Sequence, residues 1–340
     1  MSDSRSPNPL ERSLPRREKI NTKQVALRIL WALTLSALLY FALRNAPLKE
    51  IFQTLQQLQL WQVIILLLIN IAIYALITLR WWIIVRAESR AVPYLPFLAV
   101  RMAVFGVSYF TLGPQVGGEP LQVLYLQRKY GLTYTRATAS VIMDKLLEFL
   151  ANFLLLGVGI TAILQAGILS ANGNSSLVSL SGLVILFLWP PVHIFLMMRG
   201  IYPVSAILRK FSNNKPVRFI AASERMAGTF CRRHFRSLVA AIVVSLLAAG
   251  ALVCEYYFIT SFLSINLSVS QAIAAWTAGW LSFLVPWPGG LGALEASQVF
   301  ALGAFGITAA SAISVTLWIR LRDLVLGGLG LLFASGGVGK

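Results

Sequence analysis

The sequence carries little charge and no long stretch with the composition of a soluble domain. Charged residues make up 12% of the 340 residues and hydrophobic residues 57%, whereas soluble globular domains carry roughly 25% charge. The mean hydropathy is +0.74. A sizeable soluble catalytic domain within these residues is therefore excluded. We predict an all-α polytopic membrane protein, because helices satisfy their own backbone hydrogen bonds in lipid.

Cysteine, histidine and enzyme motifs are also scarce. Cys231 and Cys254 cannot build a disulfide framework, and His193 and His234 stand outside any metal-ligand spacing. We find no Gly-x-Ser-x-Gly, P-loop, His-Glu-x-x-His or paired aspartate motif. The sequence therefore predicts no metal, no cofactor and no catalytic residues. A membrane-embedded transferase stays open as a less favoured alternative.

The net charge of +17 is distributed unevenly. Residues 1–28 carry seven basic side chains, and residues 199–236 carry nine against the single acid Glu224, while 167–176 and 264–268 carry none. This asymmetry follows the positive-inside rule. It favours cytoplasmic N- and C-termini beside anionic lipid rather than a nucleic-acid partner.

The apolar runs predict one transmembrane domain over 25–335 after a disordered basic tail at 1–24. Arg80, Trp81, Trp82 and Arg86 are interpreted as interfacial anchors at the end of the second span. A polar, basic stretch at 121–136 follows the next apolar segment. About six full spans are expected, at 27–43, 60–85, 137–165, 177–198, 237–263 and 308–334.

The linker 199–236 contains an amphipathic helix. Its apolar face is formed by Phe219, Ile220, Ser223, Met226, Ala227 and Phe230, with arginines opposite. Two interpretations stay open: a helix lying on anionic lipid, or a helix packed on the transmembrane bundle.

Two segments break the apolar pattern with proline and glycine. Leu112-Gly-Pro-Gln-Val-Gly-Gly118 and Leu284-Val-Pro-Trp-Pro-Gly-Gly290 share Leu-x-Pro-x-x-Gly-Gly, and Glu119 and Glu295 follow them. Broken backbone at membrane depth is tolerated only inside protein or beside a wet cavity. The units 94–120 and 269–295 are therefore predicted to be re-entrant helical hairpins. The alternatives are full crossings or, for the second segment alone, a plain interfacial turn.

The match between the two segments extends along the chain. Gly131-Leu-Thr133 corresponds to Gly306-Ile-Thr308, and at the same offset Lys145 corresponds to Arg320 and Glu148 to Asp323. We predict an inverted repeat, with repeat one at about 60–165 and repeat two at about 237–334. Such repeats meet near the midplane in carriers that alternate access.

Ionisable residues inside an apolar bundle are functional candidates by default. Lys145/Glu148 and Arg320/Asp323 are spaced as i,i+3 ion pairs, which are either structural or, through the cations, a phosphate site. Glu255, beside two tyrosines, is interpreted as interfacial. The predicted substrate-binding or gating residues are Arg101, Gly117, Gly118, Glu119, Asp144, Lys145, Glu148, Pro288, Gly289, Gly290, Gly292, Glu295, Arg320, Arg322 and Asp323.

These motifs resemble the lysylphosphatidylglycerol synthase transmembrane family, also called flippase-like domain proteins. The Pro-Gly-Gly-x-Gly-x-x-Glu block ending at Glu295 is the most specific part. Asp144 and Lys145 stand where the family pattern has glutamate and arginine, so the site chemistry departs there. The resemblance implies a plasma-membrane protein that moves lipid between leaflets. Because the chain stops after the last predicted span, we expect it to lack the aminoacyl-transferase domain of fused members.

We therefore expect a translocase for a phospholipid or lipid-linked headgroup, with an anionic phospholipid as the favoured cargo. The main alternative is a non-catalytic protein that presents lipid to a separate glycosyl- or aminoacyl-transferase. The sequence leaves the lipid, the direction, the energy source and the oligomeric state open.

Overall fold

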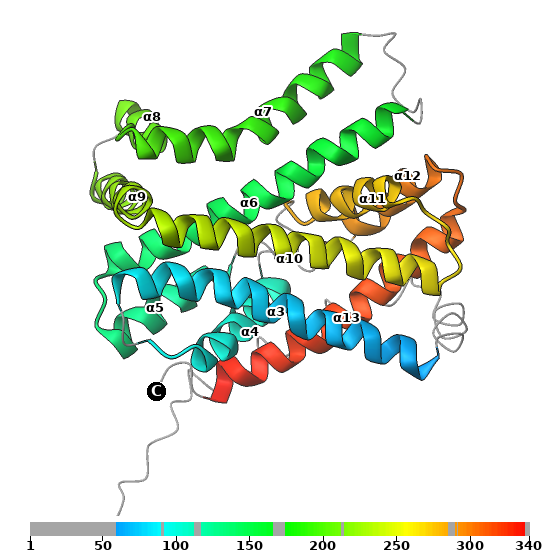
Figure 1. Cartoon of the computed structure of the whole chain (residues 1–340), viewed down its shortest axis with the longest axis horizontal. Helices are drawn as coiled ribbons and strands as arrows, with labels where there is room; N and C mark the ends of the chain where they lie inside the picture. Colours follow the sequence, from blue (N-terminus) through cyan, green and yellow to red (C-terminus); the bar gives the residue numbers. More distant parts are fainter. Residues whose placement is uncertain are drawn as a thin grey trace, which may run out of the picture. The chain divides into compact units, whose positions relative to one another are not determined.

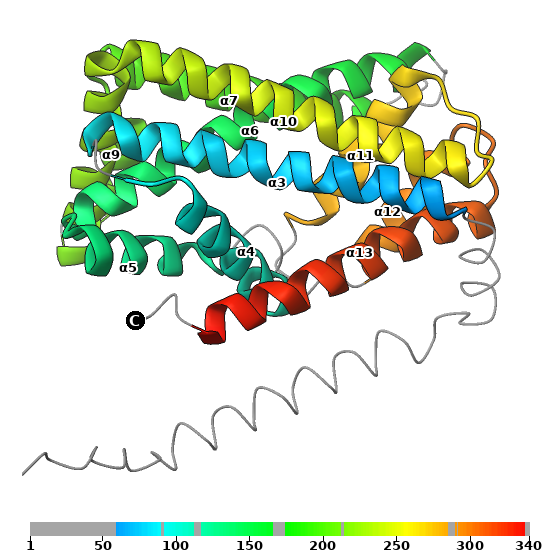
Figure 2. The same cartoon turned by 60° about the horizontal axis from the view of Figure 1, so that its bottom comes forward.

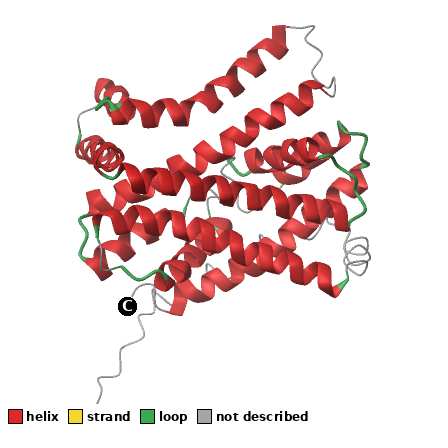
Figure 3. Ribbon diagram, in the orientation of Figure 1, coloured by secondary structure: helices red, strands yellow, loops and turns green. Residues whose placement is uncertain are grey.

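Long apolar runs with few breakers form long helices in the computed structural model, and no strand is present in the part of the chain that it describes (Figures 1 and 3). The described residues are 59–89, 92–111, 117–165, 174–211, 214–284, 290 and 292–336. The predicted tail and first span at 27–43 lie outside them, as do the tips of both predicted hairpins. The described residues all belong to one compact unit, Pro47–Lys340.

The first half of the described chain contains one hairpin between two long helices. Helix α3 (Leu60–Glu88) is followed by α4 (Leu95–Phe110), α5 (Glu119–Tyr130) and α6 (Tyr134–Gln165). The stretch at 121–136, described above only as polar and basic, is thus largely helical. Pro120 suits the first turn of α5, where a missing N–H is tolerated. Gly131 ends the helix with a φ of 65°, a conformation that glycine adopts without strain.

The second half repeats this order. Helix α10 (Phe235–Phe262) precedes α11 (Val269–Ser282), α12 (Ala293–Gly303) and α13 (Ala309–Gly336). Ser268 caps α11 by accepting from the Gln271 backbone N–H, and the Gln271 side chain accepts in return from the Ser268 N–H.

The two halves exchange their hairpins. Helix α4 packs along α13, and α11 packs along α6, while α3 lies beside α10 (Figure 2). Each hairpin therefore contacts the long terminal helix of the other half. A two-fold relation between the halves predicts such an exchanged pairing. Glycines allow the closest contact: a Cβ on Gly330 would lie 2.1 Å from the Met102 carbonyl oxygen.

Helices α7 (Asn174–Met198), α8 (Pro203–Phe211) and α9 (Lys215–Arg233) connect the halves. Of the two interpretations of the linker, packing on the bundle describes α9. It contacts α6 and α7 and buries Ala221, Ser223, Ala227 and Phe230. Phe219 and Ile220, at 40% and 36% exposure, remain at the surface.

Only α3 and α10, among the described helices, are both long and apolar enough to span a membrane by length and composition. A third span is added if the end of α7 and α8, bent by 92°, count as one. Helices α6 and α13 are long enough at 32 and 28 residues, since each residue adds about 1.5 Å. Their midpoints, however, carry the charged residues expected to form the site.

Candidate functional site: a charged cavity between the hairpins

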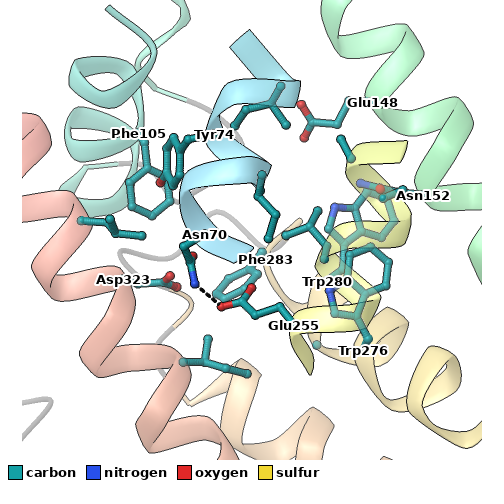
Figure 4. A pocket seen from close by; sticks show the side chains of 18 of the residues that line it. Asn70, Tyr74, Phe105, Glu148, Asn152, Glu255, Trp276, Trp280, Phe283 and Asp323 are labelled. Atoms are coloured by element: carbon teal, nitrogen blue, oxygen red, sulfur yellow. Dashed lines mark hydrogen bonds between the residues drawn. The ribbon is translucent and has the colours of Figure 1, made fainter. Parts of the chain in front are cut away.

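A cavity of about 210 Å³ lies among α3, α4, α6, α10, α11 and α13. That volume is far above the roughly 10–15 Å³ that one water needs. Its charged lining is balanced, with four cations and four carboxylates: Arg80, Arg101, Lys145, Arg322, Glu119, Glu148, Glu255 and Asp323. Figure 4 shows the polar groups beside the rings of Tyr74, Phe105, Trp276, Trp280 and Phe283.

Asp144 joins three helices on one side of the cavity. Its carboxylate is fully buried and lies 2.6 Å from Arg80 Nε of α3 and 2.6 Å from Arg101 Nη2 of α4. Arg80 also reaches Glu148 Oε2 at 3.2 Å. Both arginines are buried as well. Such a cluster persists in a low-dielectric interior only because each charge is paired.

A second cluster lies on the side of α13. Arg322 Nη1 lies 2.6 Å from Glu255 Oε2, and Nη2 lies 2.7 Å from Asp323 Oδ1. Asn70 of α3 donates its amide to the other oxygen of Glu255 at 2.7 Å (Figure 4). The prediction that Glu255 is merely interfacial was wrong, since it is 1% exposed and holds α3, α10 and α13 together.

Each hairpin carries an ion pair at the start of its second helix. Glu119, the first residue of α5, lies 3.3 Å from Lys145 Nζ of α6 and accepts the Gly117 N–H. Glu295, in the first turn of α12, receives Arg320 Nε at 2.6 Å and Nη2 at 2.9 Å. A carboxylate at a helix N-terminus is also stabilised by the helix dipole.

The chain is similar to proteins of a known family. The family model for the lysylphosphatidylglycerol synthase TM region matches residues 25–330. The chain belongs to this family. A curated relative, the UPF0104 membrane protein PH1989 of Pyrococcus horikoshii, is 24% identical over 289 residues, covering 78% of this chain and 84% of that protein. No solved structure matches significantly.

In this member of the family, most predicted site residues come together. Arg101, Glu119, Lys145, Glu148, Arg322 and Asp323 line the cavity, and Asp144, Glu295 and Arg320 contact that lining or the hairpin turns. The predicted i,i+3 pair is made by Lys145 and Glu148 at 3.5 Å, whereas Asp323 contacts its neighbour Arg322. Pro288 and Gly289 lie outside the described residues.

The described glycines of the hairpin turns have conformations or contacts that side chains resist. Gly117, Gly290 and Gly292 have φ values of 137°, 62° and 76°. A Cβ on Gly118 would lie 2.2 Å from the Val104 carbonyl oxygen. Arg320 Nη2 donates to the Gly290 carbonyl oxygen at 3.0 Å, which links the second turn to α13.

Two cavity residues, Arg80 and Asn70, and their buried neighbour Trp81 were missed or misassigned from the sequence. Arg80 and Trp81 were interpreted as interfacial anchors, but they are 2% and 0% exposed. Asn70 was not noticed. The offset of 175 that relates Lys145 to Arg320 also relates Arg80 to Glu255 and Asn70 to Ser245, and all four of these line the cavity. Extending the repeat to α3 and α10 would have found them.

Outside the cavity, His193, Ser205 and Glu224 meet where α7, α8 and α9 join. Ser205 donates its hydroxyl to Glu224 rather than to His193, so the arrangement is not that of a nucleophile activated by histidine. The Glu224 carboxylate also accepts the backbone N–H groups of Val204 and Ser205 at 3.1 and 2.8 Å. It therefore caps α8. Among the described residues, no group of three or more potential ligands is placed to hold a metal.

Proposed function

We propose that this protein is a lipid translocase of the plasma membrane that moves a phospholipid or lipid-linked headgroup between leaflets. The observation that carries the proposal is the charged cavity between two hairpins, inside a bundle whose exterior is apolar. Eight charged side chains line it, although even one charge at the centre of a span costs at least about 2.5–3.5 kcal/mol on insertion scales. A polar headgroup that passes through the bundle can interact with these charged side chains.

The exchanged packing of the hairpins supports a carrier in which access alternates. Because α4 lies on α13 and α11 lies on α6, each hairpin is part of the contact between the two halves, and movement of a hairpin changes that contact. We propose that six segments cross the membrane: residues 27–43 and the helices α3, α6, α7, α10 and α13. Both hairpins re-enter, and both termini are cytoplasmic. No chemical step is part of this proposal, and the driving force is an ion gradient, mass action or a partner protein.

The charge balance refines the expected cargo. Every lining cation already contacts a carboxylate, so the phosphate of an anionic phospholipid has to compete for Arg322 or Lys145. Lys145 and Arg322 are the more exposed of these cations, with side chains 21% and 20% exposed. Arginine offers two parallel donors to a phosphate. We therefore propose Arg322 as the first phosphate contact.

The test is scrambling of fluorescent phosphatidylglycerol and phosphatidylethanolamine in proteoliposomes. We expect the wild type to accelerate leaflet exchange and Arg322→Gln to slow it at least tenfold. Arg218→Gln, at an exposed position on α9, is the matched control and should retain the wild-type rate. If the wild type scrambles neither phosphatidylglycerol nor phosphatidylethanolamine, the translocase proposal is rejected. Copurification with a transferase would then favour the lipid-presenting alternative.

A further inference from the structure

The second helices of the two hairpins share a short motif. Glu119-Pro-Leu-Gln122-Val123 opens α5, and Glu295-Ala-Ser-Gln298-Val299 lies in the first turns of α12, at an offset of 176. Both glutamates form the ion pairs with α6 and α13 described above. The two glutamines are both fully buried. The motif therefore allows one hairpin to be compared with the other, residue by residue.

Both polar atoms of the Gln298 side chain are hydrogen-bonded within its own half. Its Nε2 donates to the Ala275 carbonyl oxygen of α11 at 2.8 Å, and its Oε1 accepts the Tyr256 hydroxyl of α10 at 2.5 Å. Gln298 and Tyr256 both line the cavity. One side chain of α12 thus ties the second hairpin to the long helix beside it.

Gln122 has no such partners. Neither its Nε2 nor its Oε1 has a hydrogen-bond partner among the described residues, and the same holds for the indole N–H of Trp81. Trp81 is the counterpart of Tyr256 at the offset of 175. Buried polar groups without partners destabilise the arrangement that contains them. Among the described residues, the first hairpin has three such buried atoms, Arg101 Nε and the two of Gln122, and the second has one, Trp280 Nε1, so the first hairpin is packed less favourably.

The first helices of the two hairpins also differ at one equivalent position that lines the cavity. A Cβ on Gly279 of α11 would lie 2.8 Å from Gln298 Nε2, so the glycine leaves room for the amide. At the offset of 175 its counterpart on α4 is Val104, which also lines the cavity and whose branched side chain is buried. The ion pairs also favour the second hairpin. Arg320 contacts Glu295 through two nitrogens, whereas Lys145 contacts Glu119 through one, at 3.3 Å.

We propose that Gln298 is a positioning residue that fastens the α11–α12 hairpin to α10, and that the α4–α5 hairpin is the half of the cavity that moves. Moving α11–α12 away from α10 and α13 breaks the buried hydrogen bond from Tyr256 to Gln298 and the two-point ion pair between Arg320 and Glu295. Rearranging α4–α5 allows the side chains of Gln122 and Trp81 to form hydrogen bonds with other groups or with water. The inference rests on the proposed translocase in assigning this motion to transport.

Matched glutamine variants test the proposal, because their melting temperatures should shift in opposite directions. Gln122→Leu removes an unpaired amide, so the melting temperature should rise while scrambling slows. Gln298→Leu leaves the Tyr256 hydroxyl without its acceptor, so the melting temperature should fall. Tyr256→Phe is a milder variant with the same expected sign if Gln298→Leu does not fold. Shifts of the same sign for Gln122→Leu and the α12 variants would overturn the proposal.

Hydrogen exchange separates this inference from the translocase itself. In the wild type, amides of α4 and α5 should exchange faster than those of α11 and α12, and Gln122→Leu should slow exchange selectively in α4 and α5. Equal exchange in the two hairpins would overturn the inference even if lipid is transported. If the wild type does not scramble lipid, the translocase fails, whereas the exchange and melting comparisons still decide which hairpin is fastened.

Discussion

Arg80 on α3 and Glu255 on α10 occupy the same position in the two halves of the chain, 175 residues apart, and face one cavity with opposite charges. Each is buried and each binds residues of its own half's terminal helix: Arg80 contacts Asp144 and Glu148 of α6, and Glu255 contacts Arg322 of α13. The repeat thus preserves the place of a charge but not its sign. At this equivalent position, the cluster around Asp144 therefore has a cation and the cluster around Arg322 has a carboxylate.

The first prediction concerns Asp144. Asp144→Asn removes the negative charge between Arg80 and Arg101, which takes from buried Arg101 the carboxylate that it contacts and leaves Arg80 with Glu148 alone. Breaking a buried ion pair from one side costs about 3–5 kcal/mol, so the purified variant should melt at a markedly lower temperature. Arg218→Gln on the surface of α9 serves as control and should change stability by no more than about 0.5 kcal/mol. Equal melting of the two variants would contradict the assigned pairing.

The second prediction is a coupling between Glu255 and Arg322. Glu255→Gln and Arg322→Gln should each destabilise the protein, because the first leaves Arg322 with Asp323 alone and the second removes the cation that contacts Glu255. The double variant should lose less than the sum of the two, by about 0.5–3 kcal/mol, as contacting residues do. A thermal-stability cycle over the four proteins measures this. Simple additivity would mean that the 2.6 Å contact contributes no interaction energy.

Much of the fold follows from patterns that are local in the sequence. The segment predicted at 137–165 forms part of helix α6, because this largely apolar run contains no proline before Gln165. The hairpin helices α4 and α11 follow from apolar segments that end at proline and glycine. Which side chains face the cavity was harder to predict, since α3 and α10 are apolar on all sides and show little amphipathicity. Hydrophobic patterning therefore gave no orientation for Arg80 or Asn70.

The pairing of charges could not be predicted from spacing alone. The i,i+3 rule predicted an Arg320/Asp323 pair, but the carboxylate of Glu295 on a neighbouring helix reaches Arg320 at 2.6 Å. Contacts between helices depend on the exchanged packing of the hairpins, which local spacing does not encode. The internal repeat is the one sequence signal that bears on it, and it identifies equivalent positions rather than contacts.

A third prediction concerns acid stability at the junction of α7, α8 and α9. Burial raises the pKa of Glu224, but hydrogen bonds from His193, Ser205 and the backbone outweigh it, so the pKa lies below the usual value. A carboxylate with a lowered pKa in the folded state stabilises it above the unfolded value of about 4.3, and this contribution is lost as the pH falls through the folded value. The melting temperature of the wild type should therefore drop on acidification below about pH 4.3.

Glu224→Gln is the matching variant. It should be less stable than the wild type at pH 7, because a neutral amide is a weaker acceptor for the cap of α8. The difference should shrink as the pH falls, since acid neutralises the wild-type carboxylate. A difference that stays constant from pH 7 to pH 3 would show that the charge of Glu224 does not stabilise this junction.

The final prediction tests the contact between α4 and α13 with two glycines on one helix. A Cβ on Gly330 would lie 2.1 Å from the Met102 carbonyl oxygen of α4, whereas a Cβ on Gly328 meets no atom within 4 Å. Gly330→Ala should therefore force the two backbones apart and destabilise the protein by about 1–3 kcal/mol, as overpacking does. Gly328→Ala should be neutral or stabilising by up to about 1 kcal/mol, because alanine favours the helix. Since both variants add one methyl group to α13, equal effects would mean that α4 does not approach α13 as closely as the structure has it.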